Sequence, residues 1–163
     1  MGHAMTADEL LAGLDAHAAR GTEFEALLEA AVEGVHALNP RFHWTGIYEL
    51  FADNVLRLGP FLGAPTDHCF IGVGSGVCGT AVAERRDLNI PDVRQITNYL
   101  ACSSETRSEL VILIRDGETI YAQIDIDSHE VAAFDDASVA DVQRIAHWLA
   151  RQYAARAASG RAA

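Results

Sequence analysis

The chain has 163 residues, half of them apolar, which suits one domain with a sizeable core. Its formal net charge is -11, all twelve Lys/Arg positions are arginine, and no stretch gathers them, so neither nucleic acid nor an anionic membrane is expected as a partner. No apolar run has the length of a spanning helix and no basic, then hydrophobic leader begins the chain, so we expect a cytoplasmic protein.

The N-terminal region, residues 6–38, has apolar residues at steps of three and four, which predicts two helices broken near Gly21. Thr22 and Glu25 have the spacing of a capping box, and Asn39-Pro40 should end the second helix. Residues 1–4 precede a second methionine and could be native or an addition, so they are left out of the fold prediction.

The period of the apolar residues then changes to two. Residues 44–50 and 55–61 are short, aromatic and β-branched, which predicts a β-hairpin turning at residues 52–54. Glycine dominates residues 72–79, a short helix is expected over residues 80–86, and a long excursion follows from Ile90 to Cys102.

A second hairpin is expected from residues 109–114 and 119–127, around Asp116-Gly117, and residues 137–155 return to helical spacing. This order lacks regular βαβ alternation. It predicts a single α+β domain with one mainly antiparallel sheet and the helices on one face.

The glycine-rich segment from Gly74 to Gly79 matches the dinucleotide-binding pattern. The helix after it is too short for an ordinary crossover and no second βαβ unit follows, so a tight turn is the preferred interpretation and no cofactor is expected. Cys69, Cys78, Cys102 and His68 could form a zinc site, but no pair has the short spacing of a zinc knuckle, so no metal is expected either.

The chain has three cysteines, an odd number that favours free or catalytic thiols over a structural disulfide framework. Cys78 could equally be a small core residue. Cys102 precedes Ser103 and Ser104 in a polar segment with Arg107 nearby, where a thiol would be accessible and a cation would favour the thiolate.

Alternation along residues 121–127 places Asp125 and Asp127 on one face of a strand. Such carboxylates often only mark solvent, and Trp44 and Tyr48, four apart on another strand, are more often core than ligand cup. If these residues lie close to the loop that carries Cys102, both the aspartate pair and the aromatic pair become candidate functional residues.

Seven segments occur together, in order: Trp44-Thr-Gly-Ile-Tyr48, Leu58-Gly-Pro-Phe-Leu-Gly63, Gly76-Val-Cys-Gly-Thr-Ala81, Ile90-Pro-Asp-Val93, Leu100-Ala-Cys102, Arg107-Ser-Glu109 and Ile124-Asp-Ile-Asp-Ser128. Over residues 40–149 this set resembles the free methionine-(R)-sulfoxide reductases, which are catalytic members of the GAF-domain family. The chain departs from the family pattern in a Cys69–Cys78 segment one residue shorter and in Ser103, where an aspartate is frequent.

The resemblance implies a six-stranded antiparallel GAF sheet with a closed ligand pocket. It also implies Cys102 as the catalytic thiol, Cys69 as the resolving thiol and Cys78 as an auxiliary thiol. The implied substrate pocket consists of Trp44, Tyr48, Glu109, Asp125 and Asp127.

The implied reaction begins with attack of the Cys102 thiolate on the sulfoxide sulfur. Asp127 or Glu109 would supply a proton, and the resulting sulfenic acid would condense with a second thiol to a disulfide that thioredoxin reduces. The competing interpretation is a non-catalytic GAF module that binds a small ligand as a sensor. The sequence leaves open whether the chain is a monomer or a homodimer.

The shared pocket sets a condition on the second hairpin. A two-residue Asp116-Gly117 loop would place Glu109 opposite Ile124, on the helix-packed face. We therefore expect either an odd-length loop with a left-handed Gly117 or a β-bulge nearby, which would turn Glu109 toward Asp125.

Overall fold

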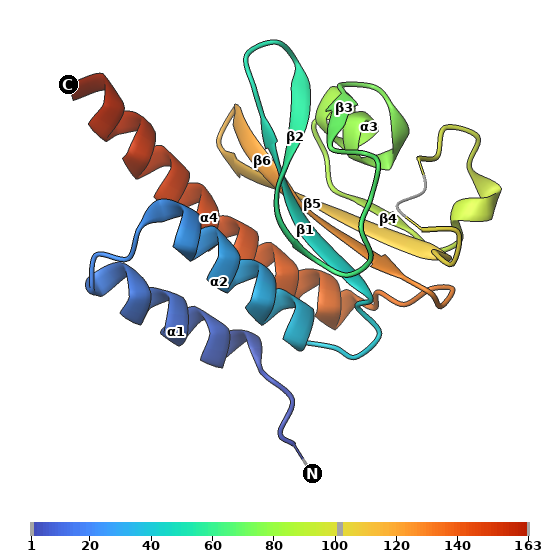
Figure 1. Ribbon diagram of the computed structural model, residues 1–163, viewed down its shortest axis with the longest axis horizontal. Helices are drawn as coiled ribbons and strands as arrows, with labels where there is room; N and C mark the ends of the chain where they lie inside the picture. Colours follow the sequence, from blue (N-terminus) through green and yellow to red (C-terminus); the bar gives the residue numbers. More distant parts are fainter. Residues whose placement is uncertain (1, 101–102, 163) are drawn as a thin grey trace.

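The computed structural model describes residues 2–100 and 103–162. One six-stranded antiparallel sheet, in the order β3-β2-β1-β6-β5-β4, forms the middle of the molecule (Figure 1). Its strands are β1 (Trp44–Leu50), β2 (Val55–Leu62), β3 (Phe70–Gly72), β4 (Leu88–Ile90), β5 (Ser108–Asp116) and β6 (Thr119–Ser128). The α+β class and the antiparallel sheet are confirmed.

Three helices lie on one side of the sheet: α2 (Phe24–Ala37) and α4 (Asp136–Ala162) pack on its face, and α1 (Ala7–Ala19) packs on the outer side of α2 and α4. The short helix α3 (Gly76–Glu84) lies with β3 on the opposite side, so the prediction that all helices share one face is wrong for this helix. None of the helices in the described part of the chain combines the length and apolar composition needed to cross a bilayer.

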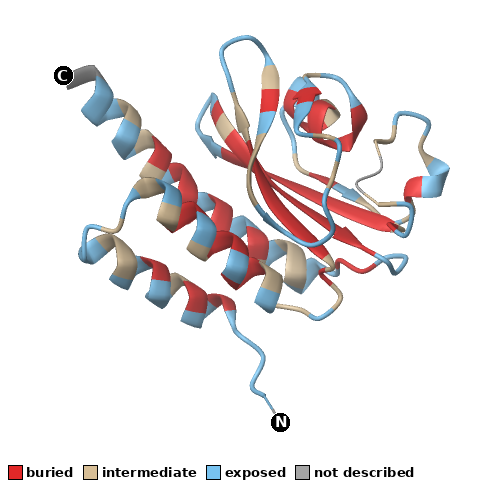
Figure 2. Ribbon diagram, viewed as in Figure 1, coloured by how far each residue is buried: buried red, intermediate tan, exposed pale blue. Residues whose placement is uncertain are grey.

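Alternation along the central strands gives the sheet two different buried faces (Figure 2). Toward the helices, Ile112, Ile124 and Ile126 pack into the larger core with residues such as Leu28 and Trp148. On the other face, a smaller core joins residues of β1, β2, β3 and β5 to α3. A side chain on β5, or on β6 from Ala122 onward, therefore belongs to one core or the other according to its parity.

The first helix carries the capping box, in which the Thr6 hydroxyl accepts a hydrogen bond from the Glu9 N–H and the Glu9 side chain accepts from the Thr6 N–H. The capping box predicted at Thr22 and Glu25 is wrong. Helix α2 begins after Glu23 without a side-chain cap, and the Thr22 hydroxyl lies 3.5 Å from Nδ1 of His17 instead.

Helix α3 begins at Gly76, four residues before its predicted start, and ends where Arg85 adopts a left-handed conformation with φ of 58°. Glycine is required inside it, since a Cβ on Gly79 would lie 2.4 Å from the carbonyl oxygen of Gly72. The glycine pattern thus serves close packing of the helix against the end of β3.

The hairpin of β5 and β6 contains a bulge, which is one of the two predicted alternatives. Asp116 pairs with Thr119 and Arg115 with Ile120, but Ile114 pairs with Ala122, so Tyr121 is the extra residue. The turn itself has two residues and a left-handed Gly117 with φ of 56°. Beyond the bulge Glu109 pairs with Asp127 and Val111 with Asp125, which puts both acidic positions of β6 on the face of Glu109.

Candidate functional site

The three central strands present the candidate residues on the face opposite the three-helix layer. Strand β1 contributes Trp44 and Tyr48, and β6 pairs beside it with Asp127 next to Trp44 and Asp125 next to Gly46. All three carboxyl residues, Glu109, Asp125 and Asp127, are at most 3% exposed. The structure therefore brings together the predicted pocket residues of three strands and buries them.

Gly46 lets the Trp44 ring lie across strand β1. A Cβ at this position would come within 2.5 Å of the indole ring and 3.0 Å of the Phe61 side chain. The Trp44 ring stacks with two aromatic rings, with centroid distances of 5.5 Å to Phe61 and 6.3 Å to Tyr48. The stacked arrangement of these rings therefore requires a residue without a Cβ atom at position 46.

Polar ends of the aromatic residues hold the loop that crosses the site. The Trp44 Nε1–H donates to the carbonyl of Ala64 at 3.0 Å, and the Tyr48 hydroxyl donates to the carbonyl of His68 at 2.7 Å. These two bonds fasten the segment that leads into Cys69. The Cys69 side chain is exposed, with Sγ 3.8 Å from the carbonyl oxygen of Thr66.

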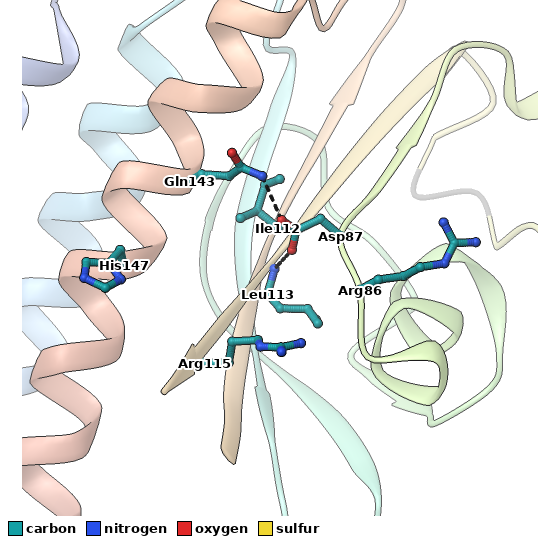
Figure 3. Close-up of a pocket in the computed structure, with 7 residues that line it drawn as sticks. All are labelled: Arg86, Asp87, Ile112, Leu113, Arg115, Gln143 and His147. Carbon is teal, nitrogen blue, oxygen red and sulfur yellow. Dashed lines mark hydrogen bonds between the residues drawn. The ribbon is translucent and has the colours of Figure 1, made fainter. Parts of the chain in front are cut away.

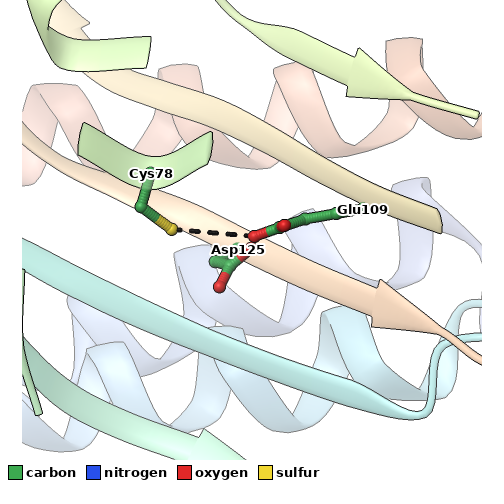
Figure 4. Close-up of side chains that lie close together, drawn as sticks. All are labelled: Cys78, Glu109 and Asp125. Carbon is green, nitrogen blue, oxygen red and sulfur yellow. Dashed lines mark hydrogen bonds between the residues drawn. The ribbon is translucent and has the colours of Figure 1, made fainter. Parts of the chain in front are cut away.

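Cys78 supplies a buried thiol to the site. It is in the first turn of α3, it is 4% exposed, and its Sγ lies 3.8 Å from Oε1 of Glu109 (Figure 4). The sulfur and one carboxylate oxygen each of Glu109 and Asp125 all lie within 4.8 Å of one another. Cys102, the predicted catalytic thiol, lies outside the described residues.

The carboxyl groups are strongly perturbed. Burial, together with the negative charges of Asp125 and Asp127, raises the pKa of Glu109 well above its usual range. Burial also raises the pKa of Asp125, and hydrogen bonds to the side chains of Glu109 and Cys78 offset part of that shift. One proton held at Glu109 relieves the repulsion within the group.

The space at this point is small, about 10 Å³, which is room for one water-sized atom. Its lining is Ile71, Ser75, Gly76, Val77, Cys78, Leu100, Glu109 and Asp125. No arginine or histidine occurs in this lining, and the chain has no lysine. An acidic cavity thus lacks a counter-charge among the described residues around it.

Gln123 shares this face and was not predicted as a site residue. It pairs with Tyr48 and Leu113 across the neighbouring strands and is fully buried, and neither atom of its amide has a hydrogen-bond partner among the described residues. The alternation that selected Asp125 and Asp127 also places Gln123, so the signal was present in the sequence.

A larger cleft of about 320 Å³ lies elsewhere, between the β4–β5 edge of the sheet and α4 (Figure 3). Asp87 joins its walls by accepting hydrogen bonds from the Leu113 N–H at 2.8 Å and from Gln143 at 3.0 Å. Arg86 pairs with Glu84, and Arg115 donates to a backbone carbonyl. Its charged groups have structural partners, so this cleft offers less to a ligand than the acidic cavity.

Comparisons with known proteins agree with this geometry. The GAF domain family matches residues 22–153. The free methionine-R-sulfoxide reductase of Saccharomyces cerevisiae is 37% identical over 108 residues, covering 64% of this chain and 59% of that protein. The chain spans about three fifths of the length of the curated relatives that it matches first.

Solved structures extend the likeness over more of the chain. The type II free methionine-R-sulfoxide reductase of Thermoplasma acidophilum superposes with a TM-score of 0.75 at 35% identity, covering 78% of this chain and 90% of that one. The Neisseria meningitidis enzyme in complex with its substrate gives a TM-score of 0.84 at 27% identity, covering 94% and 91%. The chain belongs to the GAF-domain family, and its relatives within that family include free methionine-R-sulfoxide reductases.

Proposed function

We propose that the protein reduces free methionine-(R)-sulfoxide to methionine. The observation that carries this proposal is the group of three buried carboxyl residues beside a thiol and two aromatic rings, without a cation in the described lining of the cavity. Relatives named as reductases of this substrate support it.

The free amino acid supplies what the cavity lacks. Its ammonium group would neutralise the carboxylates, and its thioether stem would pack against Trp44 and Tyr48. Methionine sulfoxide needs far more room than 10 Å³, so binding displaces side chains that line the cavity. Glu109 is the proton donor we favour over Asp127, because its raised pKa keeps a proton available near neutral pH.

The thiol chemistry balances with two cysteines. The Cys102 thiolate attacks the sulfoxide sulfur, the oxygen is transferred to the cysteine as sulfenic acid, and methionine leaves. The Cys69 thiol then attacks the sulfenic sulfur, so that a disulfide forms and water is released. Thioredoxin would return both thiols in a reducing cytoplasm, with Cys78 as an auxiliary thiol.

Single-turnover measurements test these roles. Cys102→Ser should release no methionine from pre-reduced protein, since the nucleophile is lost. Cys69→Ser should release about one methionine per chain but lose most thioredoxin-driven cycling, since the sulfenic acid is not resolved. A burst from Cys102→Ser would refute the assignment of the nucleophile.

The same assay separates the enzyme from a GAF sensor. A sensor would bind a small ligand and release no methionine, whichever epimer of the sulfoxide is supplied. Wild-type protein that binds methionine sulfoxide with full occupancy but turns none over would overturn the proposed function.

A further inference from the structure

The glycine-rich segment at the start of α3 has a second use besides the packing of Gly79. Ser75, in the N-cap position of α3, makes no side-chain hydrogen bond to the helix. The N–H of Gly76, the first residue of the helix, instead donates to Oδ1 of Asn98 at 3.0 Å. A residue from the segment between β4 and β5 therefore satisfies one of the backbone groups that a helix start leaves without a partner inside the helix.

The Asn98 amide uses its donors on the same turn. Its Nδ2 group donates to the carbonyl of Gly74 at 3.0 Å and to the Thr80 hydroxyl at 3.2 Å. Gly74 and Gly76 have positive φ values of 96° and 63°, so the backbone bends there in a way that other residues rarely allow. One side chain thus bonds to three residues of the glycine-rich turn and α3, which fixes its own segment against the helix.

Leu100 extends this contact two residues further along the chain. A Cβ on Gly76 would lie 2.9 Å from Cγ of Leu100, so glycine lets the leucine approach the helix start. Leu100 also lines the small acidic cavity. At the base of the segment, the Val93 N–H donates to the Arg107 carbonyl at 2.8 Å. The segment is therefore held at its base and, through Asn98 and Leu100, over the start of α3.

These contacts bear on catalysis because Cys102 lies four residues after Asn98 in the sequence. A thiolate must approach the sulfoxide sulfur to about 3 to 3.5 Å, and a misplacement of about 1 Å can cost about two orders of magnitude in rate. The cavity of about 10 Å³ does not hold methionine sulfoxide, so lining side chains such as Leu100 must move when it binds. Asn98 is not among the described residues that line the cavity, so its hydrogen bonds can persist during that movement.

We propose that Asn98 is a positioning residue, which ties the segment that carries Cys102 to the start of α3 and so keeps the thiol aligned with the bound substrate. The inference rests on the proposed function, in which Cys102 is the nucleophile. Loss of the Asn98 amide should slow attack on the bound sulfoxide, which requires a fixed geometry. It should not slow attack on a small diffusing electrophile, which requires none.

The test compares Asn98→Ala with Asn89→Ala, a matched control whose side chain donates to the Phe134 carbonyl at 3.0 Å. Methionine release is measured in a single turnover of pre-reduced protein with saturating methionine-(R)-sulfoxide. Alkylation by iodoacetamide, followed on the Cys102 peptide by mass spectrometry, measures the reactivity of the thiol. We expect Asn98→Ala to slow methionine release at least about tenfold without slowing alkylation more than about twofold, and Asn89→Ala to change neither rate more than about twofold.

Hydrogen exchange of backbone amides provides a measurement that does not depend on the reaction. The Gly76 amide should exchange at least about fivefold faster in Asn98→Ala than in the wild type, whereas Asn98→Asp, which keeps the acceptor oxygen, should retain its protection. Unchanged Gly76 exchange in Asn98→Ala would refute the connection to α3.

Other outcomes would overturn the positioning role. These are methionine release as fast in Asn98→Ala as in the wild type, an equal loss in Asn89→Ala, or alkylation that slows in parallel with methionine release. A wild type that releases no methionine would refute the proposed function and, with it, the catalytic role of Asn98. The Gly76 exchange would in that case still show whether Asn98 fixes the segment to α3.

Discussion

Replacing Glu109 by glutamine should change how stability depends on pH. The folded protein raises the pKa of Glu109 well above its usual range, so over an interval of pH the folded state holds a proton that the unfolded state has lost. This contribution to stability is fully present below the unfolded pKa of about 4.3 and is lost as the pH rises toward the folded pKa.

The magnitude follows from linkage. One extra proton in the folded state lowers the free energy of unfolding by about 1.4 kcal/mol for each pH unit within that interval. Other groups contribute with the opposite sign in this interval, since burial lowers the pKa values of His36 and His43, so the comparison must be between variant and wild type. The variant should have a slope more positive by about 1.4 kcal/mol per pH unit.

Urea unfolding at pH 5, 6 and 7 measures both slopes. Glu118→Gln is the matched control, because its side chain is 95% exposed at the turn between β5 and β6, and its slope should equal that of the wild type. Saturating methionine, whose ammonium would favour ionised carboxylates, should reduce the difference. If Glu109→Gln and Glu118→Gln have indistinguishable slopes, Glu109 does not hold a proton in the folded protein.

Three further predictions concern packing, the loop and specificity. Gly46→Ala should destabilise the protein by roughly 1 to 3 kcal/mol in urea unfolding, because the new methyl group meets the Trp44 ring. The control Gly13→Ala, which has open space on helix α1, should stabilise the protein by about 0.5 to 1 kcal/mol. Equal effects of the two substitutions would contradict the packing argument. Tyr48→Phe removes the hydrogen bond to the His68 carbonyl, which is worth about 1 kcal/mol, and should speed proteolytic cleavage within residues 63–69 about fivefold. The control Tyr121→Phe, on the helix side of the sheet, should leave the cleavage rate unchanged. Peptide-bound methionine sulfoxide should react at least about tenfold more slowly than the free amino acid, as measured by kcat/KM, since an amide leaves the carboxylates without their counter-ion; comparable values would refute an ammonium-binding pocket.

The sequence predicted the parts of the fold that rest on repeated local patterns. The hairpin of β1 and β2 and the helices on one face of the sheet follow from hydrophobic periodicity over seven or more residues. Strands β3 and β4 have three residues each and show no alternation that could be recognised. Their positions depend on pairing with β2 and β5, which is not local information.

The candidate site was predictable where a constraint joined distant residues. Requiring Glu109 to face Asp125 predicted either an odd-length loop or a bulge, and the hairpin contains a bulge at Tyr121. By contrast, the glycines of residues 72–79 predicted a turn where α3 in fact begins. Glycine is needed there because Gly79 packs against Gly72, and this tertiary contact is not visible in the local sequence. The proximity of Cys78 to Glu109 likewise depends on how α3 docks against the sheet and could not be deduced from spacing.

The parity of β6 makes the chain intolerant of length changes in one strand. Ile124 and Ile126 belong to the helix-side core, while Asp125 and Asp127 lie on the opposite face with Glu109. If a single residue is deleted between these positions and the turn, there are two outcomes. Either the bulge at Tyr121 is lost and the register is kept, or the two sets of side chains exchange faces. Natural insertions and deletions should therefore accumulate in the loop of residues 63–69 and be rare within β6, and a deletion scan of the gene should show the same contrast.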